Sequence, residues 1–128
     1  MTTSKATEAA DEIITVTAEP MGGAGVQAVV PRLGNVVSTF AVAGSSTTPS
    51  RLINITNLDL STNTPAVVAL QPRQADNQDF GFPDEFTVQV IRTSTTSILC
   101  RILRTDANSG WGQNLRLDLF IVDNVLNP

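Results

Sequence analysis

Hydrophobic and polar side chains alternate along most of this chain after residue 12. The pattern is clearest in NLRLDLFIV, residues 114–122, where every second position is aliphatic: Leu115, Leu117, Leu119 and Ile121. A period of two places these side chains on one face of a β-strand, whereas a helix would distribute them around its axis. We therefore predict a strand over this segment, with the aliphatic row buried.

Other segments with a strand-like pattern are IITVTA (13–18), GVQAVVP (25–31), NVVSTFAVA (35–43), RLINITNL (51–58), PAVVALQP (65–72), EFTVQVIR (85–92) and SILCRILR (97–104). Proline bounds GVQAVVP and PAVVALQP, which favours strand ends or sheet edges because proline has no N–H to donate to a ladder. No long helix is predicted. We expect an all-β fold, an antiparallel, jelly-roll-like β-sandwich of about eight strands. The strand order stays open between a jelly roll and another eight-stranded sandwich.

Two loops have distinct turn signatures. TSTT, residues 93–96, separates two alternating runs and predicts a hairpin connection. DANSG, residues 106–110, opens like a calcium-binding loop, but Gly110 stands where an oxygen ligand is needed and no closing glutamate follows. A hairpin turn with Gly110 at a positive φ accounts for this segment better, and no metal site is expected.

The length of 128 residues fits one domain. Residues 1–12 are small, polar and charged, and we expect an arm that a partner orders, followed by a single sandwich domain over residues 13–128. The arm lacks a basic start followed by an apolar core, so no secretory signal is expected, and the protein is expected to be made in a cytoplasm. The loop over residues 71–85 is long, and its Phe80 and Phe82 either cap one end of the sandwich or contact a neighbouring subunit or ligand.

The composition disfavours most kinds of binding and catalysis. A net charge of −4, with Lys5 as the sole lysine and arginines scattered, argues against binding to nucleic acid or to anionic membranes. Histidine and tyrosine are absent, which removes the commonest general base and the commonest zinc ligand. Cys100 lies in an apolar run, where a buried and unreactive thiol is expected, and Asp76 and Asp79 are loop carboxylates of the kind that are usually only solvated. We predict that the protein is not an enzyme and uses no cofactor.

The single tryptophan, Trp111, lies between Gly110 and Gly112, and the sequence leaves three roles open for it. Its ring could close one end of the sandwich, with the indole N–H bonded to a carbonyl. It could instead anchor a subunit interface, where tryptophan is enriched. In the third role it stacks on a sugar, and the ligand site then consists of Trp111, Asp106, Asn108 and Asn114.

Some of the predicted strands are apolar on both faces. Phe120 and Val122 lie on the face opposite the leucine row, and Arg101 lies between Leu99 and Leu103 on the second face of its strand. Because a sandwich buries only one face of each sheet, we expect a second subunit or the arm to cover these residues. The predicted assembly interface comprises Trp111, Phe80, Phe82, Phe120, Val122, Arg101 and Arg104.

The segment FTVQVIRTSTTSILCRILRTDANSGWGQNLRLDLFIVD, residues 86–123, resembles small β-rich structural proteins of tailed bacteriophages. The similarity centres on Arg101, Arg104, Asp106, Trp111, Gly112, Leu115 and Leu117. It implies a non-enzymatic virion component, such as a capsid decoration or tail-fibre protein. Such a component forms a homo-oligomer, with a trimer favoured, and contacts other virion proteins such as the major capsid protein. A fainter similarity to the H-type lectins implies the alternative of a carbohydrate-binding module for a host receptor, although the aromatic and histidine partners of their sugar sites are missing here.

Overall fold

A computed structural model of the chain describes residues 13–19, 32–74, 85–106 and 110–124. The predicted arm, the predicted strand at 25–31 and the residues Asp76, Asp79, Phe80, Phe82 and Asn108 lie outside these ranges. The strands are β1 (Ile13–Thr17), β2 (Arg32–Leu33), β3 (Val36–Ser46), β4 (Ser50–Thr56), β5 (Val67–Gln74), β6 (Phe86–Thr93), β7 (Ile98–Arg104) and β8 (Trp111–Val122).

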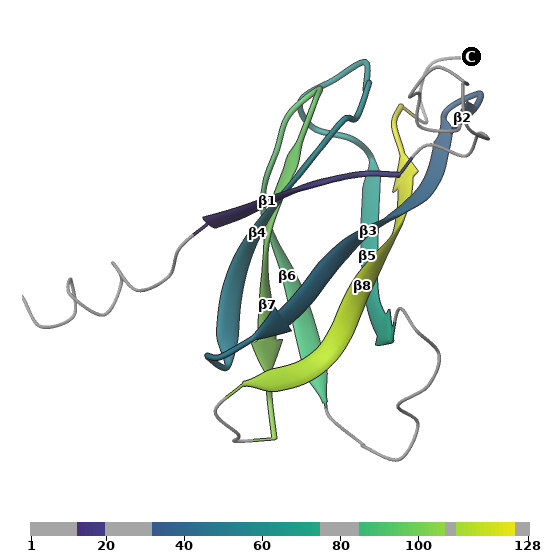
Figure 1. The fold of residues 1–128 in the computed structure, drawn as a ribbon. Helices are drawn as coiled ribbons and strands as arrows, with labels where there is room; N and C mark the ends of the chain where they lie inside the picture. The colour runs from purple at the N-terminus through teal and green to yellow at the C-terminus, as the bar shows by residue number, and fades with distance from the viewer. Residues whose placement is uncertain (1–12, 20–31, 75–84, 107–109, 125–128) are drawn as a thin grey trace, which may run out of the picture.

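The strands form two four-stranded sheets, with the orders β1-β4-β7-β6 and β2-β3-β8-β5, that pack face to face (Figure 1). We call them the first and the second sheet. The prediction of an all-β sandwich is confirmed. One pair departs from the expected antiparallel pattern, because β1 runs parallel to β4, with Ile13 opposite Leu52 and Thr17 opposite Thr56. Among the described strands, the first and the last, β1 and β8, lie in different sheets.

The core consists of the alternate side chains that the two sheets direct toward each other. The second sheet contributes the predicted aliphatic row of β8, whose members are at most 2% exposed: Leu115, Leu117, Leu119 and Ile121. The first sheet contributes fully buried side chains from β4 and β7: Ile53, Ile55, Ile98, Cys100 and Ile102. Burial of each large aliphatic side chain stabilises the fold by about 1.5–3 kcal/mol. The apolar positions that recur every two residues in the sequence are therefore the side chains that form this core.

The segment after β1 joins the two sheets. The Ala18 N–H donates to the carbonyl of Thr56 in the first sheet at 3.0 Å, and the Glu19 N–H donates to the carbonyl of Phe40 in the second at 2.8 Å. The hydroxyl of Thr39 donates in turn to the Glu19 carbonyl. These hydrogen bonds, two between backbone groups and one from the Thr39 side chain, link the two sheets.

The two predicted turns have different outcomes. Residues 94–97 connect β6 to β7, which are hydrogen-bonded neighbours, so the predicted hairpin is confirmed. The segment around Asp106 and Gly110 instead carries the chain from β7 in the first sheet to β8 in the second, so the prediction of a hairpin there is wrong. Gly110 also does not have the predicted positive φ; among the described glycines only Gly34 and Gly44 do, at 59° and 77°.

Candidate functional site

Trp111 has the first of its three possible roles, because its side chain closes one end of the core. It is 4% exposed, and its indole N–H donates to the carbonyl of Gly44 at 2.9 Å. The ring of Phe86 meets it edge to face, with 5.2 Å between ring centroids and an interplanar angle of 85°. Pairing between β3 and β8 shifts register on both sides of Gly44, which is the residue whose carbonyl receives the indole bond. The tryptophan therefore offers no face to a sugar or to a partner subunit.

Arg104 and Asp106 stabilise the connection between β7 and β8. The Nε of Arg104 donates to Oδ1 of Asp106 at 2.5 Å, and the same guanidinium donates to the carbonyl of Gly110. The two side chains are only 11% and 25% exposed. Arg104 is thus largely buried and bonded within the connection from β7 to β8. The predicted ligand set is not assembled as a sugar site, since Trp111 is buried, Asp106 is ion-paired and Asn108 lies outside the described residues, although Asn114 is exposed.

The ion pair makes stability depend on pH in a defined direction. The hydrogen bond from Arg104 is the main cause that lowers the pKa of Asp106 from its ordinary value of 3.8. A lowered pKa means that the stabilising contribution is complete above pH 3.8 and is lost as the pH falls through the folded-state pKa. We expect Asp106→Asn to be less stable than the native chain at neutral pH and to converge with it in strong acid. Urea unfolding at a series of pH values measures this, and a constant difference down to the acid limit would contradict it.

Among the remaining predicted interface residues that the structure describes, Arg101 lies in a different sheet from Phe120 and Val122. Arg101 lies on the outer face of the first sheet and donates from Nη1 to the hydroxyl of Ser50 at 3.0 Å. Phe120 is 47% exposed on the outer face of the second sheet, where Val122 is partly exposed. Phe80 and Phe82 fall outside the described residues. Phe120 and Val122 thus lie on the outer face of their strand, as expected, and the assembly interface itself stays a prediction.

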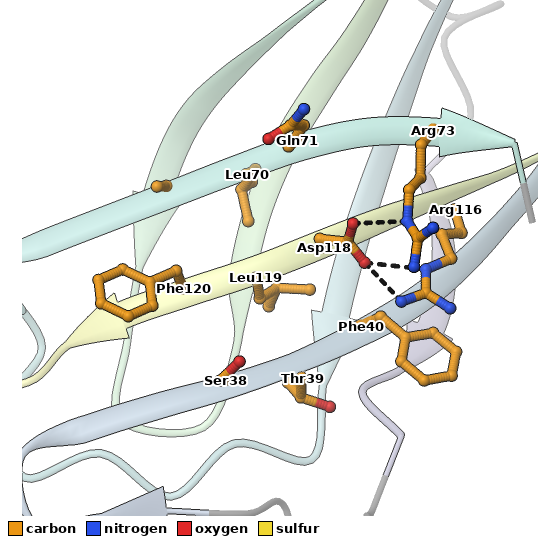
Figure 2. Close-up of a pocket in the computed structure, with 11 residues that line it drawn as sticks. Ser38, Thr39, Phe40, Leu70, Gln71, Arg73, Arg116, Asp118, Leu119 and Phe120 are labelled. Atoms are coloured by element: carbon orange, nitrogen blue, oxygen red, sulfur yellow. Dashed lines mark hydrogen bonds and ion pairs between the residues drawn. The ribbon is translucent and has the colours of Figure 1, made fainter.

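A groove of about 460 Å³ lies on this outer face of the second sheet, and the sequence patterns did not predict it. Three adjacent strands line it: β3 with Phe40, β5 with Gln71 and Arg73, and β8 with Arg116, Asp118 and Phe120. Pairing of β5 and β3 on either side of β8 brings these residues together, because Gln71 and Phe40 both lie opposite Asp118. We call this surface the β8 groove (Figure 2).

A carboxylate between two guanidinium groups lies at the centre of the β8 groove (Figure 2). The Nε of Arg73 donates to Oδ2 of Asp118 at 2.8 Å, and the Nε of Arg116 donates to Oδ1 at 2.8 Å. The Arg116 guanidinium also lies 3.9 Å from the centroid of the Phe40 ring, a cation–π contact. Arg73 is 49% exposed, so it retains N–H donors that face solvent. The cluster has one positive charge in excess between the rings of Phe40 and Phe120.

Other kinds of site receive no support from the part of the chain that the structure describes. There, histidine, cysteine, aspartate and glutamate side chains form no group of three or more that could hold a metal ion. Cys100 is fully buried, and burial raises the pKa of its thiol to about 12, so it stays protonated and unreactive at neutral pH. Over the same residues, no helix is long and apolar enough to cross a membrane.

Comparison of the chain with protein-family models, with curated proteins and with solved structures finds no match. The fold is a β-sandwich with a groove on the outer face of its second sheet, and this surface is the candidate functional site.

Proposed function

We propose that the protein is a non-enzymatic structural protein that self-associates through the outer face of its second sheet. The observation that carries the proposal is the exposure of two large apolar side chains on neighbouring strands: Phe120 is 47% exposed and Val67 is 46% exposed. In an isolated β-sandwich the outer face of a sheet contacts water, and packing within the molecule does not require large apolar side chains there. Apolar side chains that gather there are typical of a surface that a partner covers.

These side chains form one continuous patch. On the outer face, Val67 of β5 and Val36 of β3 both lie opposite Val122 of β8, and Ala69 of β5 lies opposite Phe120 in the next row. We call these five residues the apolar patch. Side chains opposite one another in antiparallel strands are about 5 Å apart, so these five residues are contiguous, and the exposed Ser38 of β3, opposite Phe120, borders them. A second copy that places the same patch against it would bury both.

The setting we propose is a bacteriophage particle, on the basis of the resemblance of residues 86–123 to phage structural proteins. In that setting the protein is a capsid decoration or tail-fibre component, forms a homo-oligomer such as a trimer, and contacts the major capsid protein. Mass spectrometry of purified particles from a host that expresses the chain tests the location directly. Absence of the protein from the particles would overturn the setting while leaving the proposed self-association untouched.

Phe120→Ser is expected to weaken self-association by about tenfold or more, because an aromatic side chain central to an interface carries much of its binding energy. Sedimentation equilibrium of the native and variant chains over a range of concentrations measures the effect. The matched control is Leu103→Ser, which removes a side chain of 40% exposure from the outer face of the opposite sheet.

Equal weakening by both serine variants would show that general destabilisation and not the apolar patch is responsible. A native chain that stays monomeric at every concentration would overturn the proposed self-association itself.

Carbohydrate binding is the second candidate function, and the β8 groove favours it. A pyranose ring could pack against Phe120 while its hydroxyl groups bond to Asp118, Gln71 and Arg73, an arrangement of apolar surface and few polar groups that is usual for ligand sites. A glycan array with the native chain tests this function. Binding that Arg73→Ala abolishes without a change in oligomeric state would favour the lectin over the structural protein, and no binding to any glycan would exclude it.

A further inference from the structure

Among the residues that the structure describes, the β8 groove holds two guanidinium groups and one carboxylate, which leaves one positive charge in excess. Both carboxylate oxygens of Asp118 are bonded to guanidinium groups, Oδ2 to Arg73 and Oδ1 to Arg116. One carboxylate therefore serves two cations, and Arg73, the more exposed of the two at 49%, has N–H donors directed to solvent. In a chain with a net charge of −4, this positive site has acidic segments of the same protein available to it.

The amino-terminal arm is such a segment. Residues 1–12 contain three acidic side chains, Glu8, Asp11 and Glu12, against the single Lys5, so their side-chain charge is opposite to that of the groove. Twelve residues of extended chain reach at most about 40 Å, which is enough to cross the face of a neighbouring small domain. Ala9 and Ala10, next to two of the acids, are small enough to pack against a flat aromatic ring.

We propose that the β8 groove binds the acidic arm, residues 1–12, of a second copy of this chain. The proposal rests on the proposed self-association and specifies its contacts. Phe120 belongs both to the apolar patch and to the lining of the groove, so a copy that covers the patch lies beside the groove. Each copy then places its arm in the groove of the other copy, and the carboxylates of the arm pair with Arg73 and Arg116. Pairs between arginine and a carboxylate are often bidentate, which makes the contact directional.

Charge reversal tests this exchange in the full-length chain. One variant reverses the groove, Arg73→Glu, and another reverses the arm, Glu8→Lys with Asp11→Lys and Glu12→Lys. Each alone is expected to weaken self-association about tenfold, because attraction is replaced by repulsion at the same contact. Arg92→Glu, an exposed reversal on β6 of the other sheet, is the matched control and is expected to have no effect. Sedimentation velocity measures association, and thermal unfolding verifies that each variant is folded.

Mixing the two reversed chains identifies which copy supplies the arm. In the mixture, the basic arm of one chain fits the reversed groove of the other, and the native acidic arm fits the native groove. We expect the equimolar mixture to recover native-like association, and we expect association of the native chain to weaken as salt is raised from about 0.15 M to about 1 M, since the Debye length falls from about 8 Å to about 3 Å.

Three results would overturn the inference. Recovery in a chain that carries both sets of reversals, but not in the mixture, would mean that the arm binds its own groove. Native-like association of both reversed variants would mean that the groove takes some other occupant. After either of these two results, the proposed function still stands if the native chain associates and its association depends on Phe120. The third result, a native chain that is monomeric, would overturn both proposals.

Discussion

Trp111→Ala is expected to lower the free energy of unfolding by about 3–5 kcal/mol, the usual cost of removing a large aromatic side chain from a core. The indole is 4% exposed and packs edge to face on Phe86, so its removal leaves a cavity between the two sheets. The change also leaves the carbonyl of Gly44 without its indole N–H. Urea unfolding followed by far-ultraviolet circular dichroism measures the effect, because the variant has no tryptophan fluorescence.

Trp111→Phe separates the two contributions. This variant retains an aromatic ring but loses the hydrogen bond and part of the side-chain volume. It should therefore lower the free energy of unfolding by less than the alanine variant does. In the native chain, a buried indole should also resist quenching by iodide. A loss below about 1 kcal/mol for Trp111→Ala would mean that the ring does not close the core.

Gly110→Ala is expected to lower the free energy of unfolding by about 1–3 kcal/mol, the range for inserting atoms into well-packed structure. A Cβ at this position would lie 2.4 Å from the carbonyl oxygen of Ser46 and 2.8 Å from the carbonyl carbon of Thr47. Both are backbone atoms, so no side chain can rotate away to relieve the overlap. The strand end that carries Ser46 would have to move, and with it the segment that receives the indole bond.

The control is the glycine on the other side of the tryptophan. A Cβ at Gly112 would have no other atom within 4 Å. Gly112→Ala is expected to be neutral or to stabilise by up to about 1 kcal/mol, because alanine restricts the unfolded chain in an otherwise ordinary strand position. Equal destabilisation by the two substitutions, measured by chemical unfolding, would contradict the assigned role of Gly110.

The parts of the fold that depend on local pattern could be predicted from the sequence. Alternation in β8 identified the strand, and it also assigned the buried face correctly from Leu115 to Ile121. The β6–β7 hairpin was predictable for the same reason, since its two strands and its turn are contiguous. The parallel pairing of β1 with β4 was not, because a sequence pattern contains no information on which distant strand lies alongside.

In the β8 groove, too, some features follow from the local sequence pattern and others depend on the pairing of distant strands. Arg116 and Asp118 are two residues apart on one strand, so their common face follows from the period of two. Arg73 joins them only because β5 pairs with β8 in a register that places it opposite Arg116. The sequence also could not choose among the roles of Trp111, since flanking glycines are compatible with a lid, an interface or a ligand site. Only the position of Ser46 shows that Gly110 is required for space and not for its φ.

The parallel attachment of β1 has a mechanical consequence. A force on the amino-terminal end, directed along β1, would load the whole β1–β4 ladder in shear, together with the bonds of Ala18 to Thr56 and of Glu19 to Phe40. Bonds loaded in this way share the load and break together, whereas a hairpin pulled from its open end is unzipped one bond at a time. Tension on the arm would therefore be transmitted to both sheets before the first strand could be peeled away.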